Sequence, residues 1–479
     1  MKDNIVFGLA DTIASIATMP GQAAVGVIKI SGSRSLAIAA RIFRAKRKKD
    51  LKKVRTYTLH YGWIVTSCKP HAASRTLKVK SGRSNDGVVD EVLLAVMRGP
   101  FSYTREDVVE IYSHSGQVVL NRILELVLSR GARLAQPGEF TRRAFLSGRI
   151  DLTQAEAVRD IVEARTERSL KLGVAQLKGR LSGDIGRIEK SLKELCVRLE
   201  AQISFPDQIR LDKTSLKKAV KRIAEEIAAL LANSQEGRFL REGVSCVICG
   251  RANVGKSSLL NMFLKEERVI VTPLAGTTRD VVEDSINIRG LPLKIYDTAG
   301  ILEPKDLIAA KAMEKSYAKI DEADLILLVF DRSKPLNKDD TFLIEKVKEK
   351  RAIFIINKID LPDKLDAGRL RKYAKPLVRL SALKNKGLSG LEESIVKAVF
   401  TKGLHKPGDI FLSNIRHIGL LKAALKDVDQ AGEYLAGRHS LDLVFFALGQ
   451  GLEAIARITG KTFNEDILDS IFGEFCIGK

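Results

Sequence analysis

The segment Gly250-Arg-Ala-Asn-Val-Gly255-Lys256-Ser257 most constrains how this chain can fold. It matches GxxxxGK[ST], and it lies between a β-type apolar run at residues 244–248 and a helical pattern. In that context the glycines let backbone N–H groups surround phosphate oxygens, and the helix N-terminus adds its dipole. The segment predicts a nucleoside triphosphate site in which Lys256 reaches the β- and γ-phosphates and the Ser257 hydroxyl binds Mg²⁺.

Three further segments follow in order and indicate a guanine base. Asp297-Thr-Ala-Gly300 ends a predicted strand, where a carboxylate can hold the Mg²⁺ shell and the Gly300 N–H can sense a γ-phosphate. Asn357-Lys358-Ile359-Asp360 ends another strand, and a fixed carboxylate there pairs with the N1–H and 2-amino donors of guanine, which adenine lacks. Ser381-Ala382-Leu383 follows the last predicted strand and would close over the base. This order favours GTP over ATP.

A switch segment is expected between the phosphate loop and Asp297. Gly276-Thr-Thr-Arg-Asp280 lies there, and Thr278 is the candidate that binds Mg²⁺ only when a γ-phosphate is present. Ile301 follows Gly300, so the water-orienting Gln of Ras-type enzymes is missing. Transition-state charge must then be met by another cation or by residues supplied on dimerisation.

From about residue 243 to 401, short apolar runs alternate with helical stretches. This alternation is typical of a doubly wound, mostly parallel sheet. The predicted strands are residues 244–248, 293–297, 325–330, 352–357 and 377–380.

Helical patterns flank this domain on both sides. Pro206 separates one apolar stripe from a second at residues 216–231, and residues 415–428 repeat the period. Two helical blocks around an inserted domain pack most simply as one bundle. The first stripe, expected on one long helix, is Leu177, Leu181, Ile185, Ile188, Leu192, Leu195 and Leu199.

The N-terminal region mixes strand-like alternation with short helices and predicts an α+β domain. Strands are expected at residues 24–31 and 91–97, helices at 35–43 and 116–128, and a loop insertion of unreadable role at about 63–90. The expected domain limits are 1–130 (N-terminal), 131–242 (first helical part), 243–401 (nucleotide domain) and 402–479 (second helical part).

The charge balance points to a polyanionic partner. Eighty Lys and Arg against 58 Asp and Glu give a net charge of +22 and a pI near 9.7, which favours nucleic acid. A generally basic proteome is the alternative. Residues 41–55 hold nine basic residues and one acid, Asp50. These residues are predicted to form a solvated surface where a helix passes into a loop, and contact with phosphate is the alternative.

The sequence favours a cytoplasmic, reduced chain. No stretch approaches the ~20 apolar residues of a membrane span, and the N-terminal segment lacks a long apolar signal core. The five cysteines lack zinc-type pairing. Cys246 and Cys249 should point to opposite faces of their predicted strand.

Beyond the nucleotide motifs, the chain resembles the tRNA modification GTPase family MnmE, also called TrmE. The resemblance covers nearly the whole chain and is carried by segments outside the nucleotide domain as well. These are Asp11-Thr-Ile-Ala-Ser-Ile-Ala-Thr18, Val25-Gly-Val-Ile-Lys-Ile-Ser-Gly32, Ser102-Tyr-Thr-Arg-Glu-Asp-Val-Val-Glu110, Pro137-Gly-Glu-Phe140, residues 143–157 (RAFLSGRIDLTQAEA) and the terminal Cys476-Ile-Gly-Lys479.

The resemblance implies a multidomain α+β and α/β fold. An N-terminal domain dimerises and binds 5-formyl- or 5,10-methylene-tetrahydrofolate, and a P-loop Ras-like G domain is inserted in a helical bundle. It further implies a homodimer that works with an FAD-dependent partner subunit of the MnmG (GidA) type, a heterotetramer with it, and a tRNA substrate. The expected reaction places an aminomethyl-type group on C5 of the wobble uridine, and GTP hydrolysis drives the meeting of the G domains.

The same resemblance implies two sets of ligands. The folate site would involve Lys29, Glu110, Arg149 and Lys479, with Cys476 nearby; the family commonly has Arg at the first of these and Lys at the third. A K⁺ ion would be held by Asn253, Thr272, Leu274 and Thr277 and would supply the missing transition-state charge.

Combining the motifs with the resemblance, we expect the catalytic residues to be Lys256, Thr278, Asp297 and Gly300. The full set expected to bind GTP is Asn253, Val254, Gly255, Lys256, Ser257, Ser258, Thr272, Pro273, Leu274, Ala275, Gly276, Thr277, Thr278, Asp297, Thr298, Ala299, Gly300, Asn357, Lys358, Ile359, Asp360, Ser381, Ala382 and Leu383.

Two departures from the family pattern leave alternatives open. Ala252 replaces a usual Pro, which should loosen the loop slightly. Ala309 stands where the family has a water-positioning Glu, and neither Glu303 nor Asp306 has the expected spacing. Slow hydrolysis would make the chain a GTP-binding scaffold. A related GTPase of ribosome assembly, of the Era or Der kind, would explain the charge and G motifs but not the α+β head or the terminal CIGK.

Overall fold

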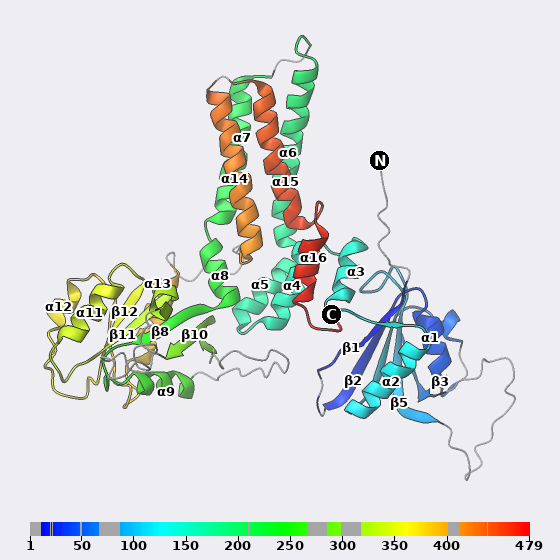
Figure 1. The fold of residues 1–479 in the computed structure, drawn as a ribbon, viewed down its shortest axis with the longest axis horizontal. Helices are drawn as coiled ribbons and strands as arrows, with labels where there is room; N and C mark the ends of the chain where they lie inside the picture. The colour runs from blue at the N-terminus through cyan, green and yellow to red at the C-terminus, as the bar shows by residue number, and fades with distance from the viewer. Residues whose placement is uncertain are drawn as a thin grey trace. The chain divides into compact units, whose positions relative to one another are not determined.

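The computed structural model describes residues 11–19, 21, 23–47, 50–66, 87–208, 211–266, 285–297, 318–400, 412–437 and 439–479. The chain divides into two compact units (Figure 1), Met1–Arg159 with Thr459–Lys479, and Asp160–Ile458. Among the described residues, no helix is long and apolar enough to cross a membrane.

The first unit contains a seven-stranded sheet in the order β3-β4-β5-β6-β2-β1-β7, antiparallel except for the β1–β7 pair. Its buried face carries alternate residues such as Ile28, Ile30, Leu94 and Ile111, which pack against α1 and α2. The elements are β1 (Ile13–Ile16), β2 (Ala23–Ser31), α1 (Ser35–Ile42), β3 (Phe43–Ala45), a 3₁₀ turn η1 (Leu51–Lys53), β4 (Thr58–Val65), β5 (Val88–Met97), β6 (Val108–Ser115), α2 (Gln117–Ser129) and β7 (Arg133–Leu134).

The same unit includes helices from both ends of the chain. Phe145 of α3 (Glu139–Leu146) and Leu152 of α4 (Leu152–Glu163) share one buried cluster with Phe472 of α16 (Glu465–Gly473) and with Phe475. The compact unit therefore comprises Met1–Arg159 together with Thr459–Lys479.

Helices of the second unit form a bundle around one buried cluster, with α14 beside α7 and α7 also in contact with α6 (Figure 1). The prediction of one long helix from Leu177 to Leu199 was wrong at its start. Leu177 ends α5, and Gly179 with φ +81° separates it from α6. The elements are α5 (Glu167–Leu177), α6 (Arg180–Ser204), α7 (Lys213–Leu231), α8 (Ser234–Glu242), α14 (Ile415–Ala436) and α15 (Leu441–Thr459).

The nucleotide domain is a six-stranded sheet in the order β13-β12-β11-β8-β10-β9, parallel except for β9. Helices cover both faces, which confirms the doubly wound fold. Cys246 and Cys249 lie in the clusters of opposite faces, as predicted, and burial raises the pKa of both thiols. The elements are β8 (Val244–Cys249), α9 (Lys256–Glu266), β9 (Ser285–Ile288), β10 (Leu291–Asp297), β11 (Leu325–Asp331), α11 (Lys338–Val347), β12 (Ala352–Asn357), α12 (Ala367–Arg371), β13 (Leu377–Arg379) and α13 (Leu388–Val399).

Candidate functional site

The phosphate loop joins the carboxyl end of β8 to the N-terminus of α9, and its two glycines are required by close contacts. Gly250 has φ +147°, and a Cβ there would lie 2.4 Å from the Val329 carbonyl oxygen of β11. Gly255 has φ +98°, and its Cβ would lie 2.3 Å from Asn357 Nδ2. A side chain at Gly250 would collide with the backbone of β11, and one at Gly255 would displace the Asn357 amide, so the tight loop depends on glycine.

Lys256 begins α9 and turns back over the loop. Its buried Nζ donates to the carbonyl oxygens of Gly250 (3.0 Å) and Arg251 (2.8 Å). Ser257 and Ser258 are exposed in the first turn of α9. The structure thus brings a cation, two hydroxyls and a helix N-terminus to one loop, which is the donor set that a Mg²⁺-bound triphosphate needs.

Asn357, the last residue of β12, joins this loop to the expected base-binding loops. Its Nδ2 donates to the Val254 carbonyl at 2.8 Å. Its Oδ1 accepts from the backbone N–H of Lys358 (2.8 Å) and of Ala382 (3.0 Å). One buried amide therefore sets the positions of three segments that are far apart in the sequence.

Asp331 belongs to the same network, and the sequence analysis missed it. Lys358 Nζ donates to Asp331 Oδ2 (2.7 Å) and to the Asn253 carbonyl (2.6 Å). Asp331 is 1% exposed; burial alone would raise its pKa, but the bonds from Lys358 and Ser333 outweigh burial and lower it. Asp331 could have been found from its position at the carboxyl end of β11, the strand between β8 and β12, because ligands bind at the carboxyl ends of the strands in such sheets.

Asp360 is exposed and oriented for a ligand by one neighbour. The buried Ser381 hydroxyl donates to its Oδ1, and this bond, ahead of all other causes, lowers the pKa of Asp360. Ser381 Oγ in turn accepts from the Lys384 N–H at 3.3 Å. The side chain of Leu383 is 81% exposed. An ionised carboxylate beside an open apolar side chain suits a planar base with N–H donors.

Part of the expected site lies outside the described residues. Asp297 is the last residue of β10, in register with Ile248 of β8, which places its backbone beside the phosphate loop. The expected residues outside the described chain are Thr272, Pro273, Leu274, Ala275, Gly276, Thr277, Thr278, Thr298, Ala299 and Gly300, and so are Glu303, Asp306 and Ala309.

The residues expected to bind folate form a second cluster, in the first unit. Lys29 of β2 lies opposite Glu110 of β6, with Nζ 3.7 Å from Glu110 Oε1. The Lys29 ammonium lies 5.6 Å from the ring centre of Tyr103, and the Arg149 guanidinium lies 4.6 Å from the same ring. Tyr112 donates to Glu110 Oε2 at 2.6 Å, which raises the pKa of Tyr112 to about 12.

Lys479 joins this cluster from the other end of the sequence. Burial and the positive charge of Lys29 lower the pKa of Lys479. Gly478 has φ +97°, and a Cβ there would lie 2.8 Å from the Ile16 carbonyl, so the segment lies against β1. Cys476 is exposed. Two cations thus flank the Tyr103 ring, and one of them, Lys29, pairs with Glu110 and repels Lys479. This arrangement suits an anionic aromatic ligand.

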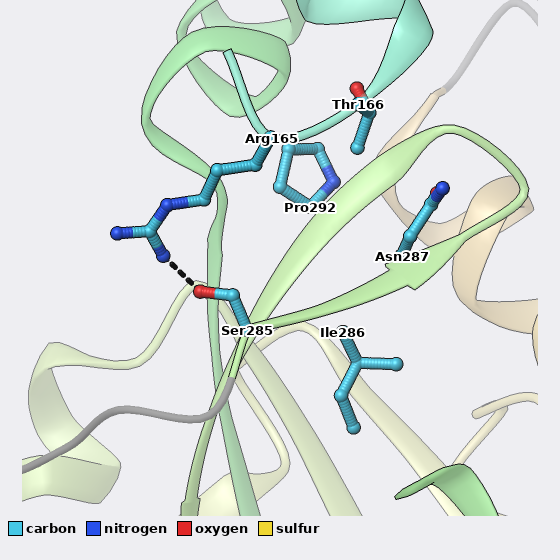
Figure 2. Close-up of a pocket in the computed structure, with 6 residues that line it drawn as sticks. All are labelled: Arg165, Thr166, Ser285, Ile286, Asn287 and Pro292. Carbon is cyan, nitrogen blue, oxygen red and sulfur yellow. Dashed lines mark hydrogen bonds between the residues drawn. The ribbon is translucent and has the colours of Figure 1, made fainter. Parts of the chain in front are cut away.

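The β9–β10 hairpin of the nucleotide domain contacts the segment between α4 and α5 (Figure 2). Arg165 donates to the Ser285 hydroxyl. Because β9 begins directly after residues 267–284 and β10 ends at Asp297, this contact connects the expected switch segment to the helical part of the unit. The pocket at the contact is lined by Arg165, Thr166, Ser285, Ile286, Asn287 and Pro292.

Comparison with known proteins covers the whole chain. Residues 12–149 match the family described as GTP-binding protein TrmE N-terminus, and residues 152–476 match the MnmE helical domain. The tRNA modification GTPase MnmE of Thermoanaerobacter pseudethanolicus is 42% identical over 473 residues, which cover 98% of this chain and 99% of that protein. The Bacillus subtilis protein of the same name is 40% identical over 475 residues, covering 98% and 100%.

A solved structure of Aquifex aeolicus Era with GDP and AlF₄⁻ bound is 30% identical, covers 38% of this chain and 66% of that one, and has a TM-score of 0.28. The two family matches and the full-length identity to MnmE proteins show the family: this chain belongs to the tRNA modification GTPases named MnmE.

Proposed function

We propose that this tRNA modification GTPase, with an FAD-dependent partner, installs a (carboxymethyl)aminomethyl-type group at C5 of the wobble uridine of certain tRNAs. A tetrahydrofolate would supply the one-carbon unit, and GTP hydrolysis would drive dimerisation of the G domains. The proposal is carried by Lys29 and Arg149 on the Tyr103 ring, with Lys479 beside Lys29, together with the candidate guanine nucleotide site in the same chain. We further propose that the chain acts in the cytoplasm.

The described nucleotide residues fit GTP with Mg²⁺. Gly250 and Gly255 form a cradle that a Cβ would fill, and Lys256 supplies the cation for phosphate oxygens. Ser257 and Thr278 would hold Mg²⁺, which stabilises negative charge on the phosphates. Asn253 with Thr272, Leu274 and Thr277 would hold K⁺. Asn253 suits this role. Its backbone has φ +61°, its carbonyl accepts a hydrogen bond from Lys358 Nζ, and its side chain is exposed.

The second cluster fits a folate by its charge. Lys29, Arg149 and Lys479 give three cations against the single carboxylate of Glu110, and Lys479 is destabilised as an ammonium by Lys29. A glutamate tail would relieve this repulsion, and the Glu110 carboxylate can accept from pterin N–H groups. Tyr103 offers a ring between two of the cations. When bound, the folate supplies the one-carbon unit; these residues bind and orient it.

The partner, the homodimer and the heterotetramer are proposed from family membership. On the same ground, the redox half of the reaction is assigned to the FAD-dependent subunit. The net charge of +22 supports a tRNA substrate.

GTP hydrolysis measured in KCl and in NaCl at matched ionic strength tests the cation site. Strong stimulation by K⁺ is expected if Asn253 and the switch loop hold the ion, and it would show that another acid replaces the Glu missing at Ala309. Equal, barely detectable rates in both salts would leave a GTP-binding scaffold, and rescue by Ala309→Glu would then identify the missing group.

Mass spectrometry of wobble uridine after deletion of the gene tests the pathway itself. Loss of the C5 group is expected. Unchanged modification would contradict the proposal and favour the ribosome-assembly alternative. Lys29→Ala and Lys479→Ala are expected to abolish the C5 group while leaving GTP hydrolysis measurable, because both residues belong to the first unit.

A further inference from the structure

We propose that the chain binds RNA on a basic surface at the β3–β4 edge of the N-terminal sheet, through phosphates and unpaired bases. This β3–β4 patch consists of the exposed cations Arg44, Lys46, Arg47, Lys52, Lys53 and Arg55 with the aromatic residues Tyr57, Tyr61 and Trp63. The proposal rests on the tRNA substrate of the proposed function and assigns it a surface.

Cations outnumber carboxylates in the patch. None of its six cations forms an ion pair with a residue in the part of the chain that the structure describes. Asp50 lies within the segment, but its carboxylate accepts from the Lys52 N–H and caps η1. Glu91 of β5 lies opposite Trp63 and accepts from the Tyr61 hydroxyl, so six cations face two carboxylates. Such an excess of exposed cations attracts a polyanion by counterion release.

The segment that carries these cations is held in place by neutral contacts. Leu51 is buried, and Arg98 of the loop after β5 donates to the carbonyls of Val54 (2.8 Å), Lys52 and Leu51. The Arg98 guanidinium therefore donates to the backbone of η1 and of Val54, which follows it, while the side chains of Lys52 and Lys53 remain exposed. A fixed backbone lowers the entropy lost when these side chains bind phosphates.

Aromatic rings are interleaved with the cations on the exposed side of β4. Tyr61 and Trp63 alternate with the buried Gly62 and Ile64, and their ring centres are 6.0 Å apart. Lys46 Nζ lies 5.0 Å from the Tyr61 ring centre and the Arg44 guanidinium 5.8 Å from that of Trp63. The helices α1 and α2 pack on the opposite face.

This combination fits RNA in particular. Lysine and arginine bind phosphates of any nucleic acid, whereas exposed aromatic rings beside them stack on bases that are not paired. A tRNA offers such bases in its loops, next to its phosphate backbone. An anionic lipid surface would also attract the cations, and the experiment below separates the two.

Trp63 is the one tryptophan in the sequence, so intrinsic tryptophan fluorescence reports on the patch alone. Full-length protein would be titrated with an unmodified tRNA transcript, following both Trp63 emission and the anisotropy of labelled tRNA. The patch variant is Arg47→Ala/Lys52→Ala/Lys53→Ala, in which no substituted residue contacts Trp63. The control is Lys213→Ala/Lys217→Ala/Lys218→Ala on α7, which removes the same charge from another exposed face.

In the wild type and the control, tRNA should quench Trp63. The patch variant should bind about tenfold more weakly, and its salt dependence should fall by about 2 to 3 in log–log slope. An unchanged Trp63 melting transition would show that the variant is folded. Equal binding by both triple variants, with Trp63 unaffected, would overturn the proposed surface.

Two other results would also overturn it. If the wild type binds no tRNA, RNA contact belongs to another subunit, while the proposed function still stands or falls on the wobble uridine measurement. If vesicles of phosphatidylserine quench Trp63 and tRNA does not compete, the patch binds membranes instead.

Discussion

Lys358 and Asp331 show how one ion pair can fix the geometry of a nucleotide site. Lys358 adopts φ +62°, donates to the Asn253 carbonyl of the phosphate loop and to the buried Asp331 carboxylate, and is directly followed by the loop that ends at Asp360. The pair therefore fixes the distance between the phosphate and base ends of the site.

Replacing Asp331 with Asn should weaken binding of a fluorescent GDP analogue about tenfold and destabilise the second unit by about 1–3 kcal/mol, because the partly buried Lys358 ammonium loses its charged acceptor. Asp363→Asn is the matched control: its carboxylate pairs with Arg332 but is 46% exposed. Equal effects of the two substitutions would contradict the positioning role.

The Asp331 carboxyl also predicts a pH dependence. Its pKa is lowered in the folded chain, so its contribution to stability is complete above the pKa it has when unfolded, near 3.8, and is lost as the pH falls through the lower folded value. Denaturant unfolding of wild type and Asp331→Asn should therefore differ at neutral pH and converge in strong acid. A constant difference down to the acid limit would show that the charge is irrelevant.

At the scale of elements, the β9–β10 hairpin connects the nucleotide site to the helical part of the second unit. It contacts Arg165 of the segment before α5 and lies close to Arg168 in the first turn of α5. The same region contacts α8, the helix before β8, in two ways. The Ser169 hydroxyl donates to the Leu240 carbonyl oxygen (2.6 Å), and Arg241 Nε forms an ion pair with Asp160 Oδ1 (2.7 Å). A displacement of the β9–β10 hairpin would therefore move the segment before α5 and, through it, α8, because these parts are in direct contact.

Gly290→Ala should disturb this connection. Gly290 has φ +89°, and a Cβ there would lie 2.7 Å from Arg168 Cδ, so strain and steric clash should cost about 1–2 kcal/mol in the unfolding of the second unit. Gly186→Ala is the control, since a Cβ within α6 meets nothing within 4 Å and should stabilise by about 0.5–1 kcal/mol. Thermal unfolding with a nucleotide probe measures both, and a harmless Gly290→Ala would show that the hairpin adapts freely.

At the scale of the molecule, the first unit is built from both ends of the described chain. Phe472 of α16 is 2% exposed and packs against Phe145 of α3, whose ring centre is 6.4 Å away. The N-terminal sheet and the terminal Cys476–Lys479 segment therefore belong to one folding unit, which explains how Lys479 meets Lys29.

Phe472→Ala should destabilise the first unit by about 3–5 kcal/mol through the cavity it leaves. The unfolding transition of Trp63, which lies in that unit, should move to lower temperature while affinity for a GDP analogue in the second unit is unchanged. Phe446→Ala, at a 65% exposed position of α15, should leave both readouts unaltered. A parallel loss of nucleotide binding would show that the units unfold together.

Local patterns determined much of this protein. The apolar runs at β8, β10, β11 and β12 and the phosphate-loop glycines could be found from the sequence, because strand burial and tight phosphate loops require particular residues at short spacing. The apolar stripes of α6, α7 and α14 were found in the same way. The break at Gly179 was not, because a left-handed residue inside an apolar period went unrecognised.

Contacts between distant segments were decided only by the tertiary structure. Asp331 looked like an ordinary strand end until the sheet order placed β11 between β8 and β12 and Lys358 turned back onto it. The extension of the first unit by Thr459–Lys479 likewise depends on Phe472 and Phe475 filling a cluster on α3 and α4. Apolar burial is non-directional, so a sequence shows that such residues must be buried, and only packing determines against what.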